Sequence, residues 1–186
     1  MDNAWRDTVN EDDFEWTGEM ELPKLAALRI APEFSGRSVN LDIRSNIIQI
    51  EGENEDGDGV TDEQQAAIGF LQKHEDVVVA KILEALSETV RRQRAGGGWE
   101  GWDGPGTIDD VMPRDMNPQK AATRIEIDRV LFSSRSRNGM AYIEIYGEGA
   151  WDPEHGFYAV FQGERLVDCG QQGSGWEDKT EDDPAE

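Results

Sequence analysis

The stretch from Ala150 to Tyr158, AWDPEHGFY, places an indole, two carboxylates and an imidazole within five consecutive residues. Asp152, Glu154 and His155 are residue types that exchange protons near neutral pH, or that bind a metal ion when further ligands join them. In an extended chain Glu154 and His155 would point to opposite sides, and the sequence indicates no additional metal ligand nearby. A small metal-dependent or acid–base hydrolase built on these three residues is therefore one hypothesis.

The order of residues Trp151 to Gly156 also favours a specified turn between two strands. Pro153 fixes its own φ and favours an extended conformation at Asp152, while Gly156 permits a backbone that other residues resist. Asp152 can accept backbone N–H groups within such a turn. The indole would then cover the corner of a sheet while His155 forms a hydrogen bond across it. We favour this structural corner, with no catalytic residue, over the hydrolase.

Other familiar sites have little support in the residue inventory. Asn54, Asp56 and Asp58, followed by Gly59, match the first half of an EF-hand calcium loop. The second half does not match, since Gln65 stands where the bidentate Glu is required, so the three residues are only a weak calcium candidate. Two histidines without a His-x-x-x-His spacing do not make a zinc site. We expect no cofactor.

The charge of the chain limits its partners. Its 186 residues contain 18 Lys and Arg against 40 Asp and Glu, a formal net charge of −22. Nucleic acid and anionic membranes are poor partners for such a chain, because phosphate binding needs a basic surface. A basic protein or a metal cation remains compatible with the charge. Acidic runs are also commonly solvated tails that keep a protein in solution.

The cysteine count, the apolar runs and the first residues indicate the cellular compartment. The single cysteine, Cys169, allows no intramolecular disulfide. No run approaches the roughly 18 apolar residues of a membrane span, and the first residues lack the basic and apolar segments of a signal peptide. We expect a soluble cytoplasmic protein.

Alternating apolar residues predict strands in the first third of the chain. They occupy residues 14–22, 39–43 and 47–50, and residues 25–30 form a possible further strand. Together these segments predict a small N-terminal sheet.

A helix is predicted to follow. Thr61 and Gln64 have the spacing of a capping box, and apolar residues at spacings of four are expected to face the core: Val78, Ile82, Leu86 and Val90. The polar residues 72–76 could divide this helix in two. A connector rich in Gly and Trp, residues 95–106, ends it.

The C-terminal part predicts an antiparallel meander. After a short helix near 117–122, strand-like residues occupy 124–132, 140–147, 156–161 and 165–169. Asn138-Gly139 and Gln162-Gly163 are the expected tight turns. The chain is therefore predicted to be α+β, with helices packed on one face of the sheet. A single domain is expected over residues 14–172, between an acidic flexible N-terminus (1–13) and a disordered acidic tail (173–186).

The segment AYIEIYGEGAWDPEHGFYAVFQGERLVDCG resembles the Trp-Asp-x-Glu-His-Gly signature of a family of bacterial domains of unknown function. The Trp16-Thr-Gly start, TDEQQAAIGFLQKHEDVVVAKILEAL and RIEIDRVLF follow the order of that family. The resemblance covers about residues 15–171 and implies no established activity, although some similar acidic proteins act as immunity factors beside toxins. We therefore expect a non-enzymatic protein-binding module that neutralises a basic partner, with the oligomeric state left open.

Overall fold

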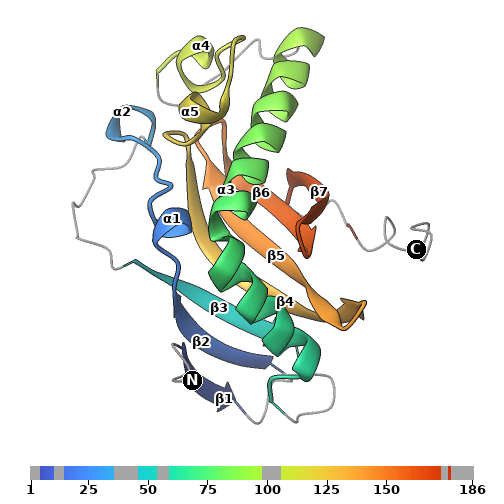
Figure 1. The fold of residues 1–186 in the computed structure, drawn as a ribbon. Coiled ribbons are helices and arrows are strands. Elements are labelled where there is room, and N and C mark those ends of the chain that lie inside the picture. Colours follow the sequence, from blue (N-terminus) through green and yellow to red (C-terminus); the bar gives the residue numbers. More distant parts are fainter. Residues whose placement is uncertain are drawn as a thin grey trace.

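A computed structural model describes residues 5–10, 15–35, 46–53, 59–97, 106–172 and 176. The elements in chain order are β1 (Trp5–Asn10), β2 (Glu15–Glu21), α1 (Pro23–Ala26), α2 (Pro32–Ser35), β3 (Ile47–Glu53), α3 (Asp62–Gly96), α4 (Ile108–Val111), α5 (Pro118–Ala121), β4 (Ile125–Arg137), β5 (Met140–Gly149), β6 (Asp152–Gln162) and β7 (Arg165–Gln171). Figure 1 shows α3 lying across one face of a twisted sheet. The predicted α+β class is confirmed.

The seven strands among these described residues belong to one sheet, in which their spatial order is their order in the chain. Neighbouring strands are antiparallel except β3 and β4, which pair in parallel from Gln49 with Arg129 to Gly52 with Phe132. A parallel pair needs a crossover connection, and α3 lies within it. The strands expected to form a small N-terminal sheet are therefore part of a larger one, because this parallel pairing joins them to the meander.

The N-terminal strands follow the predicted alternation in part. Trp16 and Met20 of β2 and Ile48 and Ile50 of β3 are buried. The strand expected at residues 25–30 was wrong, because Pro23 takes the first helical position of α1 and Leu25 is buried on it. The strand expected at residues 39–43 lies outside the described residues. The edge strand β1 was not predicted at all.

Helix α3 begins where the capping box predicted. The Thr61 side chain accepts from the Gln64 backbone, and the Gln64 side chain accepts from the Thr61 backbone. The helix runs 35 residues, about 50 Å. His74 has non-helical angles (φ −121°, ψ 21°), so two helical segments meet at a kink within residues 72–76, where the sequence predicted a division. Val78, Ile82, Leu86 and Val90 are all buried, as predicted.

The C-terminal meander is also confirmed. Asn138 (φ 52°) and Gly139 (φ 73°) form the tight turn between β4 and β5, and both positive angles suit a two-residue hairpin. The turn between β6 and β7 lies one residue later than predicted, because Gln162 pairs with Arg165 across Gly163 and Glu164. The Asn117 side chain caps α5.

The sheet buries side chains on both faces. On β5, Ala141, Ile143 and Ile145 belong to the main core, which α3 covers. Tyr142, next to them on the opposite face, packs with Tyr158, Val160 and Trp176 in a smaller cluster. Trp176 lies in the segment predicted to be a disordered tail, yet only 5% of it is exposed. Its indole N–H donates to Glu144 Oε2 at 3.0 Å.

Candidate functional site

The segment Trp151 to Gly156 forms the corner and first residues of the β5–β6 hairpin. Gly149 pairs with Asp152, and the next pair is Gly147 with Phe157. Four residues, 153–156, therefore stand opposite the single residue Glu148, which makes a large β-bulge. Gly156 has φ 66°, and a Cβ there would lie 2.5 Å from the Gly147 carbonyl oxygen. The bulge therefore requires glycine at this position.

Asp152 and His155 are brought together within the bulge. Asp152 Oδ1 accepts the backbone N–H of His155 at 3.2 Å and lies 2.9 Å from His155 Nδ1. The imidazole is nevertheless exposed over 56% of its side chain, and Glu154 is exposed. Trp151 is buried at the sheet corner. The geometry thus contains both the turn hydrogen bond and the carboxylate–imidazole pair that the sequence suggested.

The other sequence-predicted ligands are those of the weak calcium candidate. Asn54, Asp56 and Asp58 lie outside the described residues. Within the part of the chain that the structure describes, no group of three or more His, Cys, Asp or Glu side chains is arranged to hold a metal ion. None of the helices among those residues is long and apolar enough to cross a membrane.

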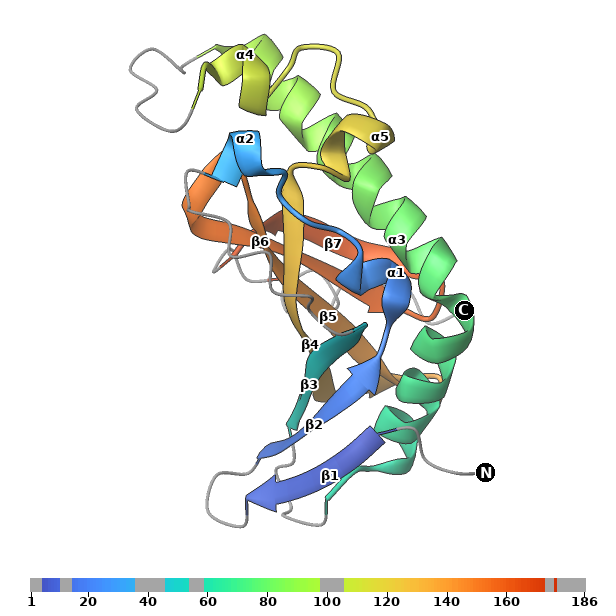
Figure 2. The same ribbon diagram turned by 90° about the vertical axis from the view of Figure 1, so that its left-hand side faces the viewer.

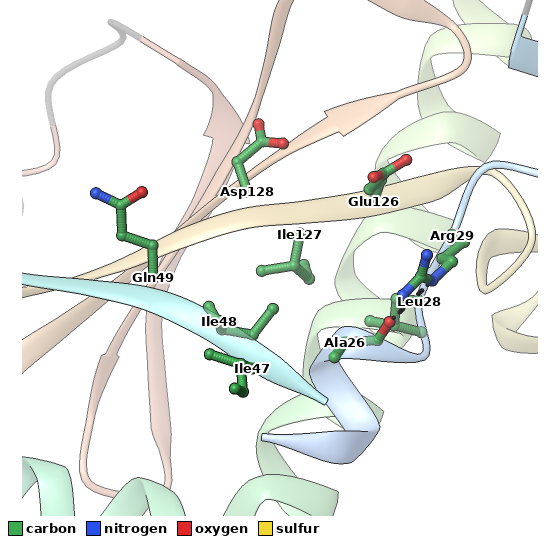
Figure 3. Close-up of a pocket in the computed structure, with 9 residues that line it drawn as sticks. All are labelled: Ala26, Leu28, Arg29, Ile47, Ile48, Gln49, Glu126, Ile127 and Asp128. Carbon is green, nitrogen blue, oxygen red and sulfur yellow. Dashed lines mark hydrogen bonds between the residues drawn. The ribbon is translucent and has the colours of Figure 1, made fainter. Parts of the chain in front are cut away.

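A small cavity lies where β3 and β4 separate beyond their parallel pairing (Figure 3). Its volume is about 80 Å³, and Leu28, Ile47, Ile48 and Ile127 line it together with Ala26 and the polar side chains of Arg29, Gln49, Glu126 and Asp128. A water molecule occupies roughly 30 Å³ of liquid. The cavity therefore has room for a few waters and is too small for an organic substrate.

A much larger concavity lies beside α3, and two polar contacts shape it. The buried Glu75 carboxylate accepts the backbone N–H groups of Lys24 and Leu25 at 2.7 and 2.8 Å, which holds α1 against the helix. Further along, Arg91 donates to the Met116 carbonyl oxygen at 3.0 Å, next to α5. These contacts are sixteen residues apart on α3, about 24 Å. Figure 2 shows α1 and α5 beside different parts of α3.

We call this concavity the α3 notch. Its volume is about 680 Å³, and apolar side chains supply half of its lining: Ala27, Val79, Ala80, Leu83 and Pro118. Lys24, Asp76, Glu84, Ser87 and Arg91 complete it. Ligand sites commonly occupy 300–1,000 Å³, are mostly apolar and carry a few polar groups. The notch has the size and lining of a binding site.

The charges around the notch are paired at its two ends. Lys24 Nζ lies 3.7 Å from Asp76 Oδ2, and Arg91 lies 2.6 Å from Glu88 Oε2. Hydrogen bonds from Arg91 and then Arg92 lower the pKa of Glu88. Glu84, between the two ends, is exposed and has no ion-pair partner among the described residues. The centre of the notch therefore presents one uncompensated carboxylate.

Sequence reasoning did not find the notch. It assigned the stripe from Val78 to Val90 to the core and gave no role to the residues between them. The available signal was a second, narrower stripe, in which apolar Val79 and Leu83 stand beside small Ala80 and Ser87. The opposite walls could not be found in this way, because α1 was taken for a strand.

Comparison with known protein families assigns the chain to one of them. The model of a family described as a domain of unknown function, DUF6985, matches residues 11–176, so the chain belongs to that family. No curated protein and no solved structure gives a significant match.

Proposed function

We propose that this member of the family is a protein-binding module that takes apolar side chains of its partner into the α3 notch. The observation that carries the proposal is the notch itself, about 680 Å³ with an apolar floor. Binding energy in protein interfaces is concentrated in a few side chains that enter such pockets, while the surrounding contacts exclude water. The paired charges at the two ends of the notch suit the polar rim of an interface.

The partner we propose is a basic protein. A net charge of −22 attracts cationic surfaces at long range and speeds encounter, while the apolar floor supplies the contact that persists. In the more specific form of the proposal, the partner is a toxin that this chain neutralises. Co-expression of the toxin with this chain would test that form, because cells that express the toxin should recover growth when the chain is also present.

Filling the notch tests the proposal. Ala80 is exposed on α3 and lines the notch, so Ala80→Arg places a long side chain in it. Ala66→Arg is the matched control, because Ala66 is exposed on the same helix and does not line the notch. Affinity purification from the native source should recover a basic protein with the wild-type chain and Ala66→Arg, and not with Ala80→Arg.

Two checks complete this experiment. The melting temperatures of both variants should match the wild type, which excludes unfolding as the cause of any loss. The recovered protein should then bind the purified chain more weakly as salt rises, because long-range charge attraction is screened. Retention of the partner by Ala80→Arg at wild-type level would overturn the proposal.

The second candidate function is acid–base hydrolysis, favoured by the 2.9 Å contact between Asp152 and His155. Its test is ester hydrolysis by the wild-type chain and by His155→Gln, with His74→Gln as control because His74 is the other partly exposed histidine. Activity lost only in His155→Gln would support this candidate. Equal activity in all three proteins would exclude a role for His155.

A further inference from the structure

We infer that the partner segment in the α3 notch is an amphipathic α-helix, with apolar anchors and one Lys or Arg that pairs with Glu84. This inference rests on the proposed function and adds the chemistry of the occupant. Three features of the notch carry it: the elements that form it, the size of its lining side chains and the distribution of its charges.

The notch is formed by helical segments alone. Its lining residues come from α3, from α1 with its C-terminal cap Ala27, and from α5. Among the residues that the structure describes, no strand lines the notch, so an occupant there would not gain affinity by extending the sheet. Recognition must come from side chains, and a helix in a helical groove uses anchors spaced three or four residues apart.

The lining side chains suit close helix packing. Ala80, Leu83 and Ser87 follow at spacings of three and four along α3, and the Ser87 hydroxyl already donates to the Leu83 carbonyl oxygen at 2.6 Å. Small residues allow two helices to approach, and packed helices lie about 8–10 Å apart. From Asp76 to Arg91 the strip measures about 22 Å, which is about four helical turns.

The charge distribution specifies one cation on the occupant. At the ends of the notch Asp76 and Arg91 already have ion-pair partners in Lys24 and Glu88. Glu84 stands between them without such a partner among the described residues. A helix that is apolar toward the floor and carries Lys or Arg near its centre complements this pattern. An acidic residue at the same position would face Glu84 and be disfavoured.

Synthetic peptides provide defined probes. The first is a capped leucine–alanine amphipathic helix, about 18 residues long so that it spans the notch, with one central Lys. The second carries Glu in place of that Lys, and the third is a scramble of the first without an apolar face. Isothermal titration gives the dissociation constants, and amide NMR shifts of Ala80, Leu83 and Glu84 locate binding.

The Lys peptide should bind and shift the amide NMR signals of the notch residues. The Glu peptide should bind with a dissociation constant at least about three times higher. The scrambled peptide should leave these amide signals unchanged. Glu84→Gln should bring the Lys and Glu peptides to similar affinity. Glu63→Gln, which removes a carboxylate from α3 outside the notch, should preserve the difference. Equal binding of the amphipathic and scrambled peptides would overturn the inference, as would Lys and Glu peptides of equal affinity in the wild type.

Two further outcomes separate this inference from the proposed function. If Ala80→Arg abolishes capture of the native partner but no amphipathic peptide binds, the binding function stands and the helical occupant is wrong. Sedimentation of the chain alone supplies the other outcome. A concentration-dependent dimer that Ala80→Arg abolishes would identify a second copy as the occupant and overturn the inference.

Discussion

Gln64 joins three segments of the chain through one fully buried side chain. Its amide oxygen accepts from the indole N–H of Trp16 at 3.0 Å, and its amide nitrogen donates to the carbonyl oxygens of Glu53 and Phe132 at 2.6 and 3.0 Å. Trp16 belongs to β2, Glu53 to β3 and Phe132 to β4. Gln64 therefore fixes the start of α3 to the place where the N-terminal strands meet the meander.

Replacing Gln64 by Ala should lower the free energy of unfolding by about 3 kcal/mol, because several buried polar groups would lose this partner at once. Urea denaturation measures the change. Gln65→Ala is the control, since Gln65 is the exposed neighbour on the same helix, and it should change stability by less than about 0.5 kcal/mol. Equal effects of the two substitutions would mean that the hydrogen bonds of Gln64 contribute nothing net.

Cys169 should react slowly with thiol reagents in the folded protein. Burial, followed by the charge of Asp168, raises the pKa of its thiol from 9.0 to about 12. The thiolate is the reactive form, so Ellman's reagent at pH 8 should label the native protein about a thousandfold more slowly than the protein in denaturant. Labelling at similar rates in the two states would contradict the burial of this thiol.

The same shift gives a pH dependence with a definite sign. The folded state holds the Cys169 proton more tightly than the unfolded state does. The stability that the protonated Cys169 thiol contributes is therefore fully present below pH 9, and it is lost as the pH rises from about 9 toward about 12. Cys169→Ser should flatten this part of the stability curve.

At the scale of elements, the contact between β2, β3 and α3 depends on one glycine. A Cβ at Gly52 would lie 2.0 Å from the ring of Trp16, whereas a Cβ at Gly69 on α3 would meet no atom within 4 Å. Gly52→Ala should therefore destabilise the protein by about 3 kcal/mol. Gly69→Ala should stabilise it by about 0.5–1 kcal/mol through helix propensity. Thermal unfolding of both variants checks that the two substitutions change stability in opposite directions. A Gly52→Ala variant as stable as the wild type would contradict the packing of Trp16.

Local sequence signals predicted those elements that local interactions determine. The capping box at Thr61 and the Asn138-Gly139 turn need only neighbouring residues, and both are confirmed. The parallel pairing of Gln49 with Arg129 joins residues far apart in the chain, and no local pattern encodes it. The apolar residues 25–30 read as a strand because a four-residue helix is too short to show helical periodicity.

The candidate site was harder to predict for a related reason. The Asp152–His155 contact lies within one bulge, so its residue order was sufficient to suggest it. The α3 notch depends on where Glu75 and Arg91 hold two short helices against a long one. Neither contact has a signature in the sequence, because each joins a side chain to the backbone of a distant segment.

At the scale of the whole molecule, the two faces of the sheet differ. One face is covered by α3, with the notch beside it, and the other carries Tyr142, Tyr158 and Trp176. More than half of the net negative charge belongs to segments that the structure does not describe, while the notch has paired charges at its two ends and the single carboxylate of Glu84 between them. We therefore assign long-range attraction to the acidic segments and lasting contact to the notch.

A photo-crosslinking amino acid placed at position 80 tests this assignment most directly, with position 66 as the control on the same helix. Both alanines are exposed, and only Ala80 lines the notch. In cells of the native source, illumination should join position 80 to a basic protein and leave position 66 unlinked. Equal crosslinking at both positions, or crosslinking at position 66 alone, would contradict the notch as the binding surface.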